Sequence, residues 1–310
     1  MELIILITQQ IAAMFFMILV GVFLVKCHLT DEKAGEYLSQ IALRVVIPCM
    51  IIHAFQIEYS QEVAENFIIA FIGALLANVI LIAVPYSFRK KLRLTSIEQA
   101  SISYPNSGEI LLPLVASILS KEMQVYCCAF VLVQIVLLFT HGVSLLQEQK
   151  KLQLKNILKN WNMWAIIIAL FLFLSQITLP KSISLTIESF AGMAAPLCML
   201  IIGMAVGKST IKDIFGNKRS YLIVFIRLVL MPLGIILLLK ISGIANYIEG
   251  LKEIFLVVFM ATATSTAATV ATLAQGYGKD AKIAGEINIM GVFFLTITLP
   301  GMVILYQWLI

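Results

Sequence analysis

The chain has 310 residues, of which 61% are hydrophobic and 13% are charged, and its formal net charge is +5. Soluble domains carry about 45–50% apolar and about 25% charged residues, so this composition excludes an ordinary soluble protein. It indicates an all-α polytopic membrane protein that contacts the lipid bilayer over most of its surface. In such a protein the positive charge mostly encodes topology, and we infer no nucleic-acid partner from it.

A helix needs about 20 mostly apolar residues to cross a bilayer. Short connections join the segments that meet this condition, which leaves no separate soluble domain. In chain order, the ten expected spans are 4–25, 38–55, 66–88, 97–119, 123–146, 161–179, 183–207, 219–241, 252–274 and 284–309.

The basic residues of the connections predict the orientation of these spans. Sixteen of the 22 lysines and arginines follow odd-numbered spans, and four lie in the connections on the other side. Lysine and arginine are enriched in cytoplasmic loops. We therefore expect a multi-pass protein of the plasma membrane with both termini outside the cell.

A basic segment, 147–160, divides the chain into halves of five spans each, 1–146 and 161–310. An odd number of spans makes the two halves enter the membrane in opposite senses. The sequence therefore predicts a five-plus-five inverted repeat whose halves are joined by a cytoplasmic linker.

One span in each half carries residues that interrupt a helix. The fourth contains Tyr104-Pro-Asn-Ser-Gly-Glu109, and the ninth contains a run of alanine, serine and threonine, 261–269. Irregular backbone is tolerated at membrane depth only where protein buries it or where it lines a cavity, and paired interruptions mark transport sites. Close helix packing explains the run 261–269 as well as substrate contact does. Packing does not require the carboxylate of Glu109.

At 1.5 Å per residue Glu109 lies about 18 Å inside the membrane, near mid-depth. Two helices interrupted there can cross, and each second half-helix then begins at the crossing. Helix N-termini bind anions, which favours a carboxylate substrate. The candidate substrate-binding residues are Tyr104, Pro105, Asn106, Ser107, Gly108, Glu109, Thr264, Ser265, Thr266 and Thr269, and the prolines expected to break or hinge helices are Pro48, Pro105, Pro113 and Pro196.

Charged residues inside membranes are costly and usually functional. Glu109 has three possible roles: a proton carrier, a counter-ion for a cationic or zwitterionic substrate, or a cap for the second half-helix. Arg44 and Arg227 can each pair with Glu109 or with substrate, or serve structure alone, and Arg44 can snorkel to the cytoplasmic surface. Asn288 is a further candidate in coupling, although such amides more often join helices. The coupling ion is H⁺ or Na⁺, if there is one.

The stretch Asn106-Ser-Gly108-Glu-Ile-Leu-Leu-Pro113-Leu114 resembles the Asn-x-Gly-(apolar)-x-Gly-x-Pro-Leu signature of the auxin efflux carrier family. The stretches Gln275-Gly-Tyr-Gly-Lys-Asp280 and Thr298-Leu-Pro300 also resemble this family, which includes plant auxin exporters and bacterial malonate and malate permeases. The resemblance implies a scaffold of spans 1, 2, 6 and 7. It also implies a moving transport domain of spans 3–5 and 8–10, with spans 4 and 9 crossing.

Three positions depart from the family pattern. Glu109 replaces an apolar residue, Leu111 replaces a common glycine, and Ser265 stands where a proline is usual. We therefore expect the ninth span to be less rigidly broken than the fourth. A permanent charge on Glu109 would also repel an anionic substrate.

These observations predict a secondary transporter that moves a small organic acid anion by alternating access. Alternatives are a carrier of an amino acid or organic cation with Glu109 as counter-ion, and a channel-like or sensor protein. The sequence shows no Walker, HExxH or glycine-rich dinucleotide motif, so we expect neither an enzyme nor a cofactor or metal. A homodimer remains open.

Overall fold

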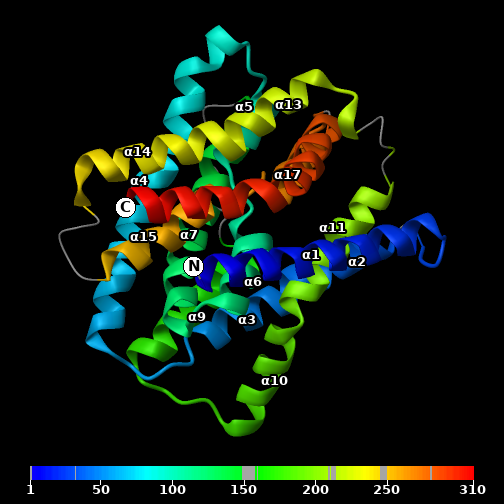
Figure 1. The fold of residues 1–310 in the computed structure, drawn as a ribbon. Coiled ribbons are helices and arrows are strands. Elements are labelled where there is room, and N and C mark those ends of the chain that lie inside the picture. Colours follow the sequence, from blue (N-terminus) through cyan, green and yellow to red (C-terminus); the bar gives the residue numbers. More distant parts are fainter. Residues whose placement is uncertain are drawn as a thin grey trace.

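The computed structural model (Figure 1) is helical throughout its described part, apart from one isolated β-bridge. Most of the expected linker 147–160 lies outside the described residues. The residues that the structure describes are 2–31, 33–148, 158, 160–208, 210, 214–244, 250–279 and 281–310.

The helices of the first half cover the first five expected spans. In chain order they are α1 (Glu2–Lys26), α2 (Ala34–Ile41), π-helical turn η1 (Ala42–Val46), α3 (Ile47–Ala54), α4 (Gln61–Leu92), α5 (Ser96–Ser103), η2 (Ser107–Leu111), α6 (Leu112–Ile118), α7 (Lys121–Leu137), η3 (Leu138–Gly142) and α8 (Val143–Gln147).

The helices of the second half cover the other five. They are α9 (Trp161–Leu174), α10 (Lys181–Gly192), α11 (Ala194–Lys208), α13 (Lys218–Phe225), η5 (Ile226–Leu230), α14 (Met231–Ser242), α15 (Leu251–Thr262), α16 (Ala268–Gly276) and α17 (Ala281–Leu309).

Seven helices in the described residues are long and apolar enough to cross a membrane, judged by length and composition alone. Two shorter apolar helices, Ser107–Ile118 and Trp161–Leu174, fall below that length. The fourth and ninth expected spans are absent from the seven because interruptions divide each into two short helices. The seven are Gln9–Lys26, Ala34–Ala54, Gln61–Leu92, Lys121–Gln147, Lys181–Lys208, Lys218–Ser242 and Lys282–Leu309.

Prolines explain most of the π-helical turns. Pro48, Pro113 and Pro232 each stand at the second residue of the α-helix that follows a π-helical turn. A proline offers no N–H to the carbonyl four residues earlier, and a π-helical turn moves that pairing to five residues. Pro48 and Pro113 therefore distort their helices without interrupting them. Pro196 follows the boundary between α10 and α11 at Met193.

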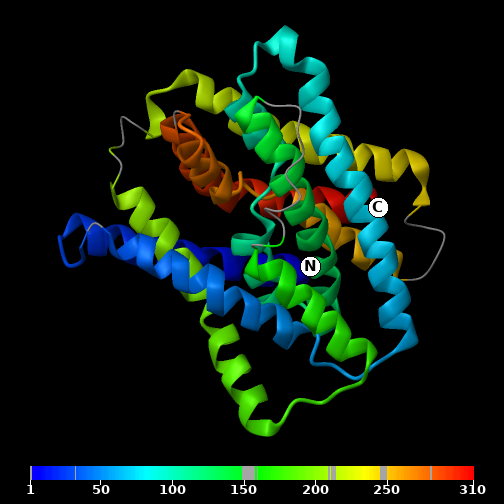
Figure 2. The same ribbon diagram turned by 180° about the vertical axis from the view of Figure 1, so that it is seen from behind.

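Helix α1 packs most extensively against α11 through glycines. A Cβ atom added to Gly203 would lie 2.0 Å from the carbonyl oxygen of Ile18, and one added to Gly21 would lie 2.3 Å from that of Leu200. The two backbones thus touch directly, as small residues allow in membrane helices. Helix α2 also packs on α11, and α3 packs on α9 and α10. Figures 1 and 2 show α1 and α2 together on the side of the molecule opposite α4.

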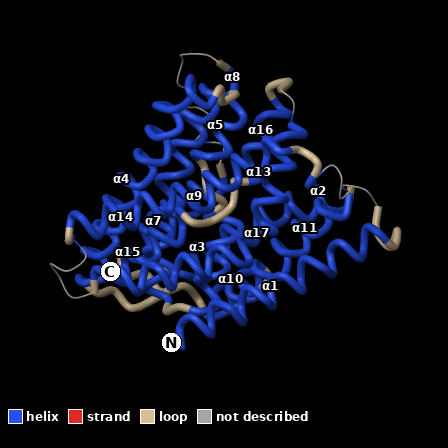
Figure 3. Tube along the Cα trace, turned by 45° about the horizontal axis from the view of Figure 1, so that its top comes forward, coloured by secondary structure: helices blue, strands red, loops and turns tan. Residues whose placement is uncertain are grey.

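A second group of helices packs around the two interrupted spans. Helix α4 packs on α7 and α15, while α13 and α14 pack on α17. Arg219 of α13 forms an ion pair with Glu98 of α5 (Nε to Oε1, 2.6 Å), which joins the two halves of the chain. Figure 3 shows both chain termini on one side of the molecule and α8 and α16 on the other.

Candidate functional site

The first interruption lies between α5 and η2 and follows from two residues. Pro105 disfavours helical backbone at Tyr104, which is extended (φ −112°, ψ 106°). Asn106 then caps the next half-helix, because its Oδ1 accepts a hydrogen bond from the backbone N–H of Glu109 (3.4 Å). Asn106 Nδ2 in turn donates to Glu109 Oε2 (3.3 Å). The cap and the carboxylate therefore hold each other in the first turn.

The second interruption, 263–267, separates α15 from α16 without a proline. The hydroxyls of Thr262 and Thr264 donate to carbonyls three residues earlier, Phe259 O (2.7 Å) and Ala261 O (2.9 Å). Such local bonds compete with helical pairing. The expectation of a lesser break here is not met: the helix stops completely, since backbone bonds to the first interruption replace the helical ones.

The two interruptions meet in the antiparallel bridge between Pro105 and Thr266. The N–H of Asn106 donates to Ser265 O (2.8 Å), and the N–H of Ala267 donates to Tyr104 O (2.9 Å). All six residues are buried. The backbone groups that a broken helix leaves unpaired are thus satisfied by the other broken helix.

Side chains from neighbouring helices fasten this bridge. Gln134 of α7 accepts from the Ser107 hydroxyl and donates to Pro105 O. The hydroxyl of Thr266 donates to Ser101 O (2.8 Å), and Asn288 Nδ2 of α17 donates to Thr266 O. Asn288 and Gln134 therefore join helices in this structure.

Tyr104 anchors the first interruption to the neighbouring span. It is completely buried, and its hydroxyl lies 3.1 Å from Leu137 O and 2.7 Å from His141 Nδ1. A Cβ atom on Gly142 would lie 3.0 Å from the Tyr104 ring, so the glycine makes room for it. Tyr104 supports the site and does not line the cavity described next.

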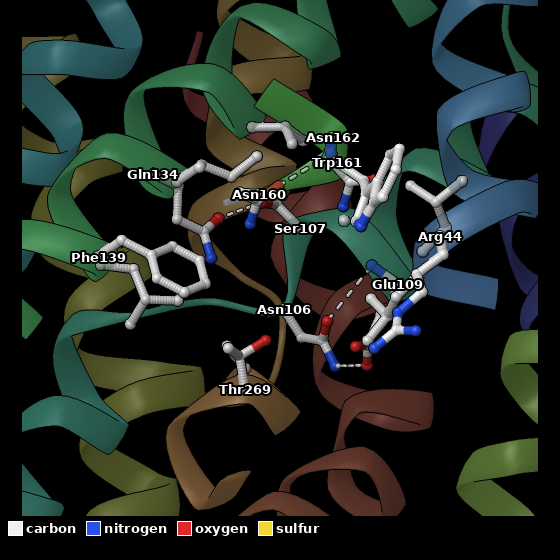
Figure 4. Close-up of a pocket in the computed structure, with 17 residues that line it drawn as sticks. Arg44, Asn106, Ser107, Glu109, Gln134, Phe139, Asn160, Trp161, Asn162 and Thr269 are labelled. Carbon is white, nitrogen blue, oxygen red and sulfur yellow. Dashed lines mark hydrogen bonds between the residues drawn. The ribbon is translucent and has the colours of Figure 1, made fainter. Parts of the chain in front are cut away.

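A cavity of about 260 Å³ lies against the first interruption (Figure 4). It is bounded by η1 and α3, by η2, by α7 and η3, by the start of α9 and by the start of α16. Its lining residues are Leu43, Arg44, Ile47, Asn106, Ser107, Gly108, Glu109, Val131, Gln134, Ile135, Leu138, Phe139, Asn160, Trp161, Asn162, Ala267 and Thr269.

The charged side chains of the cavity lie toward one end. Figure 4 shows Arg44 and Glu109 there, and Gln134 and Phe139 toward the other end. Glu109 is half-buried, and Arg44 is exposed. A Cβ atom on Gly108 would meet nothing within 4 Å, so the glycine leaves space beside the half-helix N-terminus.

The predicted site residues divide into two groups. Arg44, Asn106, Ser107, Gly108, Glu109 and Thr269 line the cavity. The remaining members of the predicted set, Tyr104, Pro105, Thr264, Ser265 and Thr266, lie in or beside the bridge.

Arg227 belongs to neither group. It is 1% exposed, and its Nη1 donates to Ile102 O (3.2 Å) in the last turn of α5, while Nε and Nη2 have no partner among the described residues. A cation suits the negative end of that helix. Arg227 therefore contacts the carbonyl end of α5 and does not line the cavity.

Sequence reasoning missed the cavity rim formed by Asn160, Trp161 and Asn162. Asn160 caps α9, since its Oδ1 accepts from the N–H groups of Asn162 (2.9 Å) and Met163 (3.2 Å). An asparagine before an apolar run signals a helix start, but that signal does not place the turn beside Gly108. Among the described residues no group of three His, Cys, Asp or Glu side chains could hold a metal ion.

Comparison with protein families gives one match. The family model described as "Membrane transport protein" matches the chain twice, over residues 6–157 and 149–303. Together the two matches cover nearly the whole chain, one for each half. No curated protein matches the chain.

Proposed function

Because the chain belongs to the auxin efflux carrier family of membrane transport proteins, we propose that it moves a small organic acid anion across the plasma membrane as a secondary transporter. Membership makes the protein a transporter and not an enzyme. The substrate class and the alternating-access mechanism are the proposed part.

The observation that carries this proposal is the cavity beside a helix N-terminus. The first turn of the half-helix from Ser107 to Ile118 faces the cavity, and Asn106 caps only the N–H of Glu109. The earlier N–H groups of Ser107 and Gly108 have no partner within the helix, which makes them suitable for an anion. Arg44 adds a positive charge to the same cavity.

We further propose ten spans in a five-plus-five inverted repeat. Helices in all ten expected spans, the family model matching once in each half, and the antiparallel meeting of the two interruptions support it. The grouping of α1, α2, α3, α9, α10 and α11 supports a scaffold of spans 1, 2, 6 and 7. The cavity lies between this group and η2, where a moving transport domain of spans 3–5 and 8–10 would slide past it.

The proposed orientation places both termini outside the cell. Lys252 Nζ donates to Ile310 O (2.6 Å), so the C-terminus lies beside the start of α15. Lys279 pairs with Glu148 (2.6 Å) on the side that carries most of the basic connections. With this orientation Asn160–Asn162, at the start of α9, would lie at the cytoplasmic end of the sixth span.

Glu109 favours a second candidate, a carrier of an amino acid or organic cation. Its carboxylate lines the cavity that would hold the substrate, where a fixed negative charge attracts a cation. If Glu109 takes up a proton during transport, the coupling ion is H⁺.

Counterflow in proteoliposomes tests the proposal. Vesicles loaded with unlabelled malonate or malate are expected to accumulate the labelled acid transiently, because a carrier exchanges substrate faster than it returns empty. Uptake without counterflow would indicate a channel. Absence of any protein-dependent uptake of organic acids would contradict the proposed function.

A further inference from the structure

Two opposite charges share the cavity, and each sits on a π-helical turn. Arg44 belongs to η1 and Glu109 to η2, and each precedes by four residues the proline that ends its turn region, Pro48 or Pro113. The two charges therefore come from different expected spans, the second and the fourth. They converge only in the folded protein, where both line the same cavity.

The two charges do not neutralise each other. No ion pair joins Arg44 to Glu109 within the described part of the chain, whose ion pairs include Arg219–Glu98 and Lys279–Glu148. The carboxylate of Glu109 accepts one hydrogen bond, from the neutral amide of Asn106. Each charge thus retains capacity for a partner of opposite sign.

A ligand with a single charge fits this cavity poorly. A simple anion would pair with Arg44 and the free N–H groups of the half-helix, but it would lie near the Glu109 carboxylate. A simple cation would pair with Glu109 but lie near Arg44 and the positive end of the helix. Such like-charge contacts are unfavourable at the effective dielectric of a partly exposed site. A ligand with both charges satisfies both groups.

The remaining wall sets the size and the polarity of the rest of the ligand. The volume of about 260 Å³ accommodates a small organic molecule. The lining includes the apolar side chains of Leu43, Ile47, Val131, Ile135, Leu138 and Phe139, together with the polar side chains of Gln134, Asn160 and Thr269. The apolar side chains favour an apolar group on the ligand.

We propose that the substrate is a zwitterionic amino acid with an apolar side chain, such as leucine. Its carboxylate binds Arg44 and the N–H groups of Ser107 and Gly108, and its ammonium binds Glu109. This inference rests on the proposed transport function and specifies its second candidate, the amino acid carrier, since a zwitterion has no net charge and is not an organic acid anion.

Three ligands that share the isobutyl group of leucine test the proposal on the unaltered, reconstituted protein. Leucine carries both charges, 2-hydroxy-4-methylpentanoate carries only the carboxylate, and 3-methylbutylamine carries only the ammonium. Counterflow of labelled leucine is measured against internal leucine, the hydroxy acid or the amine. Leucine is expected to drive counterflow at a concentration at least about tenfold lower than either analogue, because each analogue leaves one of the two cavity charges unpaired.

The variant Glu109→Gln tests whether Glu109 is the group that binds the ammonium of the substrate. We expect its preference for leucine over the hydroxy acid to fall by about tenfold or more, since the counter-ion is gone. Glu188→Gln is the matched control, because Glu188 is exposed on α10 and does not line the cavity. The control should keep the preference of the unaltered protein.

The possible outcomes distinguish failure of the zwitterion proposal from failure of the proposed transport function. If the hydroxy acid drives counterflow as well as leucine does, the proposal of a zwitterionic substrate is wrong and organic acid transport stands. The same conclusion follows if malonate drives counterflow and none of the three leucine-like ligands does. Absence of counterflow with every ligand would overturn both. If Glu109→Gln fails to fold, the ligand series on the unaltered protein still decides.

Discussion

The two interrupted spans meet in one bridge, yet they are built differently. In the first, Pro105 breaks the helix, Asn106 caps the next half-helix, and Glu109 lies in its first turn. In the second, the half-helix α16 begins at Ala268, and its N-cap residue, Ala267, makes no side-chain cap. The hydroxyls of Thr262 and Thr264 donate to carbonyls of α15.

The difference separates a ligand-facing break from a supporting one. Four consecutive residues of the first interruption, Asn106–Glu109, line the cavity, whereas the second contributes Ala267 and Thr269. The hydroxyl of Ser265 is buried without a hydrogen-bond partner in the described structure. Substitutions in the first break should therefore change transport, and loss of the Ser265 hydroxyl in the second should change stability little or not at all.

Replacement of Asn106 by alanine should have the largest effect. It removes the cap of the second half-helix and the only hydrogen-bond partner that the structure shows for the Glu109 carboxylate. We expect unfolding free energy to fall by about 1 kcal/mol. Transport should fall by roughly tenfold or more, as a bond to a charged group contributes about 1.5–3 kcal/mol. Counterflow and thermal unfolding in detergent measure the two. Unchanged transport would mean that the cap has no part in the site.

Gly108→Ala should separate transport from stability. The added methyl group meets no protein atom within 4 Å, so thermal unfolding should stay the same or improve slightly. The methyl group occupies cavity space, and apparent affinity should fall by roughly tenfold. Gly234→Ala is the control, because that glycine also has nothing within 4 Å of its Cβ position but does not line the cavity. Equal affinities in the two variants would contradict the assignment of the cavity.

The matched serines of the two breaks should respond in opposite ways. Ser107→Ala removes a hydroxyl that donates to Gln134, and it should lower unfolding free energy by about 1 kcal/mol. Ser265→Ala removes an unpartnered buried hydroxyl, and it should leave stability unchanged or raise it. Thermal unfolding of both variants in one detergent gives the comparison. A larger loss for Ser265→Ala would show that the second break depends on its side chain.

The smallest effect should come from disrupting the exposed ion pair between Lys279 and Glu148, which links the two halves of the chain. The hydrogen bond and charge of Lys279 hold the pKa of Glu148 below its usual range. A depressed carboxyl pKa stabilises the folded protein above the ordinary value of about 4.3, and this contribution is lost as pH falls through the depressed pKa. Glu148→Gln should therefore lower the midpoint of thermal unfolding slightly at neutral pH, and the difference should vanish in acid. A difference that grows in acid would contradict the pairing.

Local chemistry made the interruptions predictable, whereas the cavity walls depend on packing. The two helix interruptions are predictable from Pro105 and from the run 261–269, because each disfavours helical backbone at known positions. The sequence alone allowed two roles for Arg44, because an arginine that snorkels to the surface and one that pairs with a ligand occupy the same kind of position. The rim at Trp161 was not predictable, because it is set by where the second half of the chain docks. The π-helical turns follow from Pro48 and Pro113 only once the helices are known to continue.

The glycine contact between α1 and α11 determines which missense substitutions the protein tolerates. At Gly203 any side chain would enter the backbone of the neighbouring helix, so every missense change there should remove the protein from the membrane. At Gly108 there is open space, so variants should persist in the membrane and be lost only under selection for uptake. A mutational scan read once for abundance and once for growth would separate the two glycines. The difference between the two glycines would distinguish positions that are constrained by folding from positions that are constrained by the transported substrate.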